Sequence, residues 1–219
     1  MKRALFVILI LGAVVALAAW GASNTRVEGA PQASLLPLLS EEETAGFARA
    51  TAPDAIRFPR DLGPHEEYQT EWWYYTGNLE TAEGRRFGYQ LTFFRRALLP
   101  PQERGNQVPG EASDWRTNQV YLAHFAVSDV DGEAFYFDEQ FARGAAGLAG
   151  AQAEPYRVWL HAWEAVEVGA GRVRLVAETE EMGLDLVLAQ TLTPVLHGDG
   201  GLSPKGKAPG NASYYYSFI

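Results

Sequence analysis

A carboxylate followed by four adjacent aromatic residues is the feature of this sequence that is best suited to chemistry. Glu71 precedes Trp72, Trp73, Tyr74 and Tyr75. Successive side chains of a strand point to opposite faces, so Trp72 and Tyr74 share one face and Trp73 and Tyr75 share the other. The aromatic residues form either a core without chemistry or a wall of a ligand cavity. Glu71 is correspondingly either an edge carboxylate or a buried acid able to transfer a proton.

His124 is the second residue whose setting allows a chemical role. It stands among apolar residues in the run from Asn118 to Val130, so it is either a hydrogen-bonded core histidine or a proton donor in a cavity. The sequence contains no cysteine, which excludes disulfides, thiolate catalysis and thiolate metal sites. The four histidines are far apart in the sequence and form no H-x-H or H-E-x-x-H pair. We therefore expect neither a metal ion nor a cofactor.

The elements that must hold these residues begin with an antiparallel hairpin. Residues 71–79 alternate as one strand, residues 81–84 (TAEG) form a turn, and residues 85–96 (RRFGYQLTFFRR) alternate as the partner strand. The second strand places Tyr89 on one face together with Leu91. Aromatic residues on both faces of the first strand fit a sheet that is covered on both sides, as in the wall of a barrel or sandwich.

The rest of the chain repeats this pattern of strand and turn and contains no long segment with a helical period. We therefore predict an all-β fold, an antiparallel lipocalin-like β-barrel or sandwich with an N-terminal signal or anchor helix. Ser40 and Glu43 form a capping pattern that predicts a short helix over residues 41–50, and residues 99–117 are expected to form a long loop. Further strands are expected over residues 118–130, 133–141, 155–168, 172–180, 184–192 and 213–219, and a loop or single helical turn over residues 144–153.

The first residues carry an export pattern. Lys2 and Arg3 precede an uninterrupted apolar run, residues 4–19, and the next residues offer an A-x-G cleavage site. Residues 1–22 are thus expected to be a signal peptide or an uncleaved N-terminal anchor. This predicts a periplasmic or secreted protein, with a membrane tether through residues 4–19 if the segment is retained.

The remainder of the chain divides into a linker and a β-domain. Residues 23–55 are rich in small and polar residues and are expected to form a linker that includes the short helix. Residues 56–219 are expected to form the β-domain, truncated before a second β-domain because the last aromatic strand stops in mid-pattern. The net charge of −9 argues against a nucleic-acid partner.

Six blocks of the sequence resemble one known family. They are HEEYQTEWWYYTGNL, GRRFGYQLTFFRR, YLAHFAVSD, PYRVWLHAW, LHGDGGLSPKG and ASYYYS, in this order from His65 onward. Together they are similar to the AttH and carotenoid 1,2-hydratase (CrtC) family of secreted proteins. The resemblance implies two consecutive lipocalin-like β-domains around an apolar cavity, and a characterised branch that adds water across an isolated carbon–carbon double bond.

The resemblance also implies roles for particular residues. Hydration of an alkene needs an acid, aromatic faces that stabilise a carbocation, and a base that activates water. Glu71 and His124 are the polar groups in the matching blocks, and Trp72, Trp73 and Tyr74 are available as aromatic faces, with Tyr89 as a further substrate-binding residue. Family members continue into a second β-domain with a W-x-D-H-E-W-like block. This sequence has no such block, so it is expected to lack most of the catalytic site.

Three functional hypotheses remain open. The complete protein is a hydratase or hydrolase that acts on an apolar, lipid- or carotenoid-like ligand, with this chain as its N-terminal half. Alternatively, the chain is a non-catalytic periplasmic binding module for a hydrophobic ligand. In the third reading all aromatic residues are core, which predicts no pocket beside Trp72 or Trp73. The partners expected are a small apolar ligand and a second β-domain.

Overall fold

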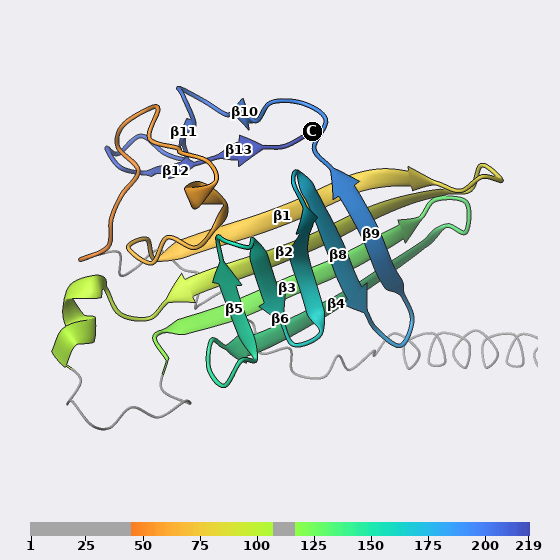
Figure 1. Ribbon diagram of the computed structural model, residues 1–219, viewed down its shortest axis with the longest axis horizontal. Coiled ribbons are helices and arrows are strands. Elements are labelled where there is room, and N and C mark those ends of the chain that lie inside the picture. The colour runs from red at the N-terminus through yellow and green to blue at the C-terminus, as the bar shows by residue number, and fades with distance from the viewer. Residues whose placement is uncertain (1–44, 107–116) are drawn as a thin grey trace, which may run out of the picture. The chain divides into compact units, whose positions relative to one another are not determined.

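Two antiparallel sheets form the body of the computed structural model, which describes residues 45–106 and 117–219 (Figure 1). Neighbouring strands in each sheet are consecutive in the chain, so both sheets are meanders. The four-stranded sheet consists of β1 (Thr70–Glu80), β2 (Arg86–Ala97), β3 (Gln119–Asp129) and β4 (Ala134–Arg143). The five-stranded sheet consists of β5 (Ala149–Gln152), β6 (Arg157–Leu160), β7 (Trp163–Gly169), β8 (Arg172–Glu178) and β9 (Gly183–Ala189).

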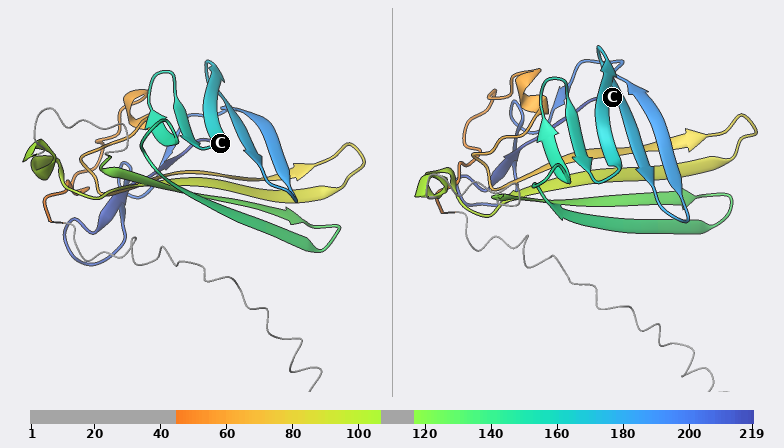
Figure 2. Two further views of the ribbon diagram at one scale, coloured as in Figure 1. Left: turned by 90° about the horizontal axis from the view of Figure 1, so that it is seen from below. Right: turned by 60° about the horizontal axis from the view of Figure 1, so that its bottom comes forward.

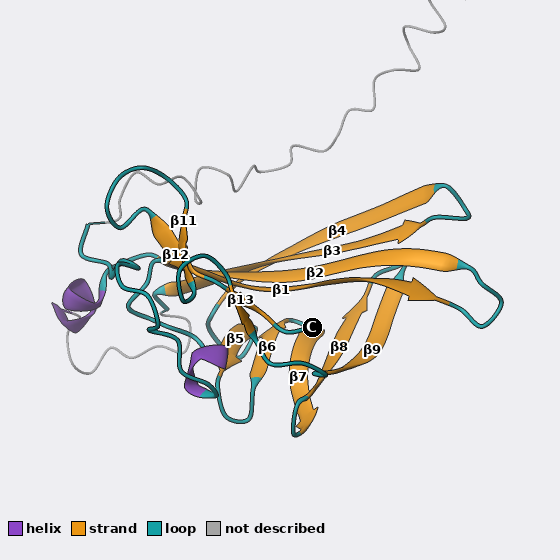
Figure 3. Cartoon of the chain, turned by 90° about the horizontal axis from the view of Figure 1, so that it is seen from above, coloured by secondary structure: helices purple, strands orange, loops and turns teal. Residues whose placement is uncertain are grey.

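Short elements complete the fold around one end of the four-stranded sheet. The 3-10 helix η2 (Arg60–Leu62) precedes β1, and the 3-10 helix η3 (Pro101–Asn106) follows β2. Two small ribbons lie near the start of β1 (Figures 1 and 3). They pair β10 (Val195–Leu196) with β13 (Tyr216–Ser217), and β11 (Leu202–Pro204) with β12 (Ala212–Tyr214).

The core lies between the two sheets, whose strands cross at a steep angle (Figures 1 and 2). Phe93 and Phe125 of the four-stranded sheet and Leu160 and Leu175 of the five-stranded sheet are completely buried. Trp163 packs its ring edge-on against Phe125, with 5.7 Å between the centroids. Its indole N–H donates to the backbone carbonyl of Glu178, so the ring is buried without an unsatisfied polar group.

The prediction of an antiparallel all-β domain is confirmed, with the aromatic hairpin as β1 and β2. The two sheets remain separate, so the described strands form a sandwich and not a closed barrel. The expected signal segment, residues 1–22, lies outside the described residues, as does most of the linker. Within residues 45–106 and 117–219, no helix is both long enough and apolar enough to span a bilayer.

The prediction of one strand over residues 155–168 is wrong. The chain reverses at His161 and Ala162, and Leu160 pairs with Trp163 to start a hairpin of β6 and β7. His161 adopts a positive φ of 53°, which a tight hairpin turn requires and which residues other than glycine adopt less readily. The turn contains none of the usual turn residues, so the sequence WLHAW gives no signal from which a turn could be predicted.

Other boundaries also differ from expectation. Residues 149–152, expected in a loop or helical turn, form β5. Residues 45–50, the described part of the expected short helix, are turn and irregular backbone. The loop expected over residues 99–117 contains η3, and its residues 107–116 lie outside the described part of the chain.

Candidate functional site

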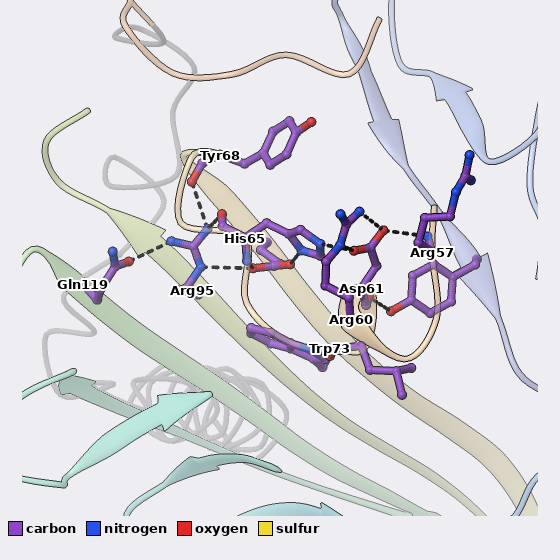
Figure 4. Close-up of polar contacts among 11 residues, drawn as sticks. Arg57, Arg60, Asp61, His65, Tyr68, Trp73, Arg95 and Gln119 are labelled. Carbon is purple, nitrogen blue, oxygen red and sulfur yellow. Dashed lines mark hydrogen bonds and ion pairs between the residues drawn. The ribbon is translucent and has the colours of Figure 1, made fainter. Parts of the chain in front are cut away.

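A chain of charged side chains lies next to the start of β1 (Figure 4). Glu71 belongs to this chain, because it contacts both His65 and Arg95. His65 Nδ1 lies 2.6 Å from Glu71 Oε1, and the backbone N–H of His65 donates to Glu71 Oε2 over 2.9 Å. On its other side, His65 Nε2 lies 3.2 Å from Asp61 Oδ1. Arg95 Nε donates to Glu71 Oε2 over 3.1 Å. Asp61, His65, Glu71 and Arg95 therefore form one connected network, which we call the charged network.

Arg95 is the fully buried member of this network, with no exposed surface. Besides Glu71, its guanidinium donates to Gln119 Oε1 at 2.8 Å and to the backbone carbonyls of His65 and Tyr68 at 2.8 and 2.9 Å. The arginine thus fixes the turn over residues 65–68 to β1, β2 and β3. A buried guanidinium with a carboxylate partner and several further acceptors satisfies the conditions under which a buried charge is tolerated.

The other end of the network holds the segment that carries η2. Asp61 pairs with the Arg60 guanidinium and accepts the backbone N–H of Arg57 at 2.7 Å. The Trp73 indole N–H donates to the backbone carbonyl of Leu62 at 2.9 Å. The Tyr216 hydroxyl group donates to the backbone carbonyl of Asp61. Residues 57–68 are therefore attached to the inner face of β1 and to β13.

The electrostatics of the network keep His65 and Asp61 charged at neutral pH. The hydrogen bond to Glu71, opposed by burial and assisted by Asp61, raises the pKa of His65 to about 9. Burial opposes ionisation of Asp61, but hydrogen bonds from Arg60, Arg57 and His65 lower its pKa to about 2. An efficient general acid or base has a pKa close to the working pH. The geometry therefore supports a role in holding residues 57–68 in place more than a role in proton transfer.

The raised pKa of His65 makes the stability of the fold depend on pH. Below pH 6.5 the imidazole is protonated in both the folded and the unfolded chain, so its stabilisation by Glu71 is fully present. As the pH rises to about 9, the unfolded chain loses this proton first and the stabilisation is progressively lost. We expect the difference in free energy of unfolding between the wild type and His65→Gln to shrink across this window. Urea titrations at several pH values measure it, and a constant difference would contradict the expectation.

His124 lies on the opposite face of the four-stranded sheet, which points away from the five-stranded sheet. The strand register places Tyr74, Thr92, His124 and Glu139 side by side in one row across β1 to β4. His124 Nε2 lies 2.9 Å from Glu139 Oε2. This face therefore carries a hydrogen-bonded imidazole–carboxylate pair at its centre.

Aromatic rings surround this pair. The His124 ring packs edge-on against Phe94 and Phe137, with centroid separations of 5.3 and 5.6 Å. β4 contributes three exposed rings, those of Phe135, Phe137 and Phe141, which are 68%, 50% and 43% exposed. We call the outer side of this sheet the outer aromatic face; its aromatic residues are Trp72, Tyr74, Phe94, Phe135, Phe137 and Phe141.

The residues singled out from the sequence divide equally between the two faces. Trp72, Tyr74 and His124 are on the outer aromatic face, whereas Glu71, Trp73 and Tyr89 are on the inner face. Glu71 and His124 are therefore not brought together, because the sheet lies between them. Trp73 and Tyr89 are core residues, 8% and 7% exposed.

The sequence reasoning missed two groups of residues. His65 and Asp61 are brought to Glu71 by the path of an irregular segment, which no local sequence pattern predicts. Arg95 lies opposite Glu71 in the register of β1 and β2. The exposed rings of β4 do have a signal, the alternation of Phe135, Phe137 and Phe141 in EAFYFDEQF.

A shallow pocket of about 300 Å³ lies at the far end of the β1–β2 hairpin. Its lining residues are Asn78, Leu79, Glu80, Arg86, Phe87 and Val130, so neither Trp72 nor Trp73 borders it. In the parts of the chain that the structure describes, no group of three or more histidine, aspartate or glutamate side chains is arranged to hold a metal ion.

These features place the chain in the class of antiparallel, lipocalin-like β-sandwich proteins. The model of the AttH-like family matches residues 49–219, and the chain belongs to that family. A crystal structure assigned to AttH from Nitrosomonas europaea is 33% identical and aligns with a TM-score of 0.60. The alignment covers 76% of this chain and 49% of the other, so the chain matches about half the length of that protein. No curated protein matches the chain.

Proposed function

We propose that this chain is the ligand-binding part of an AttH-like protein and that it holds an apolar, lipid- or carotenoid-like ligand against the outer aromatic face. The supporting observation is the exposure of Phe135, Phe137 and Phe141 on the face that also holds Trp72 and Tyr74. Large apolar side chains exposed together are typical of binding surfaces. An apolar molecule that lies across the strands removes these rings from water and gains affinity from each.

Hydratase or hydrolase activity is proposed for the complete protein, in which a second β-domain is the partner of this chain. His124 and Glu139 offer an acid–base pair on the face, and the rings of Phe94 and Phe137 beside it could stabilise a carbocation. On an open face, bulk water weakens the electrostatic stabilisation of such an intermediate, so binding without turnover is proposed for this chain alone. His124→Gln in the complete protein should abolish turnover and leave ligand affinity unchanged; unchanged turnover would refute this role.

We also propose that the protein is exported, as a periplasmic or secreted protein, with residues 4–19 as the apolar part of a signal peptide or as a membrane tether. The supporting observation is the basic start followed by the apolar run. Cell fractionation and the mass of the mature chain test this. Recovery of the chain from the cytosol with its first residues intact would refute it.

Trp72→Ala should weaken binding of the neutral apolar probe N-phenyl-1-naphthylamine by about tenfold, because covering one large ring contributes roughly 1.5 kcal/mol. Phe137→Ala should act in the same direction. Fluorescence titration of the probe measures both dissociation constants.

Val187→Ala is the matched control, since Val187 is an exposed apolar residue of β9 in the other sheet. It should leave the affinity for the probe unchanged. Failure of the wild type to bind the probe, or equal losses in Trp72→Ala and Val187→Ala, would refute the proposed site.

A further inference from the structure

The ribbon of β10 and β13 brings a serine next to a histidine. His197 follows β10 directly and Ser217 ends β13, and His197 Nε2 lies 2.7 Å from Ser217 Oγ. In the tautomer that carries its proton on Nδ1, the imidazole accepts the hydroxyl hydrogen at Nε2. This is the contact through which a histidine activates a serine for nucleophilic attack. The ribbon packs through Tyr216 on the segment that carries η2, so the pair is separate from the outer aromatic face.

The imidazole of His197 is held in one orientation. Its ring stacks on that of Tyr215, with 4.1 Å between the centroids and 15° between the planes. The backbone N–H of His197 donates to the Tyr215 carbonyl over 3.0 Å, and that of Tyr215 donates to the Gly201 carbonyl over 2.9 Å. The next residue, Gly198, has a φ of 73°, and a Cβ there would lie 2.3 Å from the Leu202 carbonyl oxygen. The chain after His197 therefore requires glycine, and the base is positioned by backbone as well as side-chain contacts.

The pair is accessible to a substrate. His197 and Ser217 are both partly buried and not enclosed. Val195 lies directly opposite Ser217 in the register and is 42% exposed. Because directly paired residues of an antiparallel ribbon point to the same face, this apolar side chain borders the hydroxyl group. A positioned base and an apolar neighbour together suit an ester with an apolar acyl group.

We infer that Ser217 and His197 are a nucleophile and its general base, and that they hydrolyse an ester with an apolar acyl group. Ser217 Oγ bonds to the carbonyl carbon of the ester while its proton passes to His197 Nε2. The tetrahedral adduct then expels the alcohol, which takes this proton, and an acyl-serine remains. Water repeats the two steps on the acyl-serine and releases the carboxylic acid and the free hydroxyl group. No carbocation forms, so this reaction differs from the hydration of an alkene, and the inference does not rest on the outer aromatic face.

The experiment treats the 219-residue chain with diisopropyl fluorophosphate, from which a reactive serine displaces fluoride at phosphorus, and maps the labelled residue by mass spectrometry. The wild type should carry a diisopropylphosphoryl group on Ser217 and should hydrolyse p-nitrophenyl butyrate. Ser217→Ala should stay unlabelled and should hydrolyse the ester only at the background rate of exposed imidazoles. His197→Gln should slow labelling by about a hundredfold, the lower end of what a positioned general base contributes.

Two variants serve as matched controls. Ser203→Ala removes a hydroxyl group of the neighbouring ribbon, one that accepts a hydrogen bond from the Lys205 ammonium. His161→Asn removes an exposed imidazole, and asparagine tolerates the left-handed backbone conformation at that turn. Both variants should be labelled on Ser217 at the rate of the wild type.

The outcomes separate a reactive pair from a hydrogen bond that only joins two strands. A wild type without a phosphoryl group on Ser217 overturns the inference. Equal labelling rates in the wild type and His197→Gln overturn it too, because His197 then does not act as the base. Equal ester hydrolysis by the wild type and Ser217→Ala would assign the activity to other residues and overturn it as well. Ser217→Ala should bind N-phenyl-1-naphthylamine as the wild type does, so failure of this inference is distinguishable from failure of the proposed function.

Discussion

Arg95→Met is expected to lower the free energy of unfolding by roughly 3–5 kcal/mol, the usual cost of removing one partner from a buried ion pair. The substitution leaves the Glu71 carboxylate without its guanidinium, and it removes the guanidinium hydrogen bonds to the backbone carbonyls of His65 and Tyr68. Methionine is an unbranched apolar side chain that fills much of the space left by the arginine. The loss of stability should therefore come mainly from the lost electrostatic interactions and not from a large cavity. Urea unfolding followed by circular dichroism measures the change.

Arg174→Met is the control for this prediction. Arg174 pairs with Asp185 on the surface, with both side chains well exposed, and such pairs contribute little to stability. This variant should unfold almost as the wild type does. Combining Arg95→Met with Glu71→Gln should cost less than the sum of the two single variants, because both remove the same ion pair. Equal losses in Arg95→Met and Arg174→Met would show that the charged network does not stabilise the fold.

Phe125→Ala is expected to destabilise the fold by roughly 3–5 kcal/mol, as is usual for removing a buried aromatic ring. Phe125 is completely buried, and its ring packs against Trp163 between the two sheets. The cavity would remove the contact that joins β3 to β7. Thermal and urea unfolding measure the loss, and Trp163 fluorescence should report the altered packing.

Phe135→Ala supplies a control of identical chemistry on the neighbouring strand. Phe135 is 68% exposed on the outer aromatic face, so its removal should leave the free energy of unfolding nearly unchanged. The same variant should weaken the binding of an apolar probe. A destabilisation as large as that of Phe125→Ala would mean that the outer face is packed and not free to bind.

The fold was predictable from the sequence wherever side-chain alternation and turn residues coincided. Alternation in β1, β2 and β3, together with the turn residues Asp131 and Gly132, was enough to define the four-stranded meander. The division of residues 155–168 into β6 and β7 was not predictable. The turn there requires His161 to adopt a left-handed backbone conformation. This conformation is imposed by the packing of the surrounding sheet and not by local sequence preference.

The candidate site was less predictable than the fold. Alternation correctly separated Trp72 from Trp73, but it could not say which face would be buried, because both faces of β1 are aromatic. The charged network depends on contacts between residues up to 30 positions apart, such as that of the Arg95 guanidinium with the backbone carbonyl of His65. No local pattern carries such information. The pairing of His124 with Glu139 follows from register, which becomes known only after β3 and β4 are aligned.

Both faces of β1 carry aromatic residues, so hydrophobicity alone does not determine the register in which β1 pairs with β2. A slip of one residue would exchange Trp73 and Tyr75 for Trp72 and Tyr74, which bury a similar apolar area. Two other features distinguish the alternatives. A slipped strand would turn Glu71 away from Arg95, and it would bring a residue with a side chain to the place of Gly77, where a Cβ would lie 2.9 Å from the Tyr89 ring. One buried charge and one glycine, which add no apolar area, thus select a single register for the central hairpin.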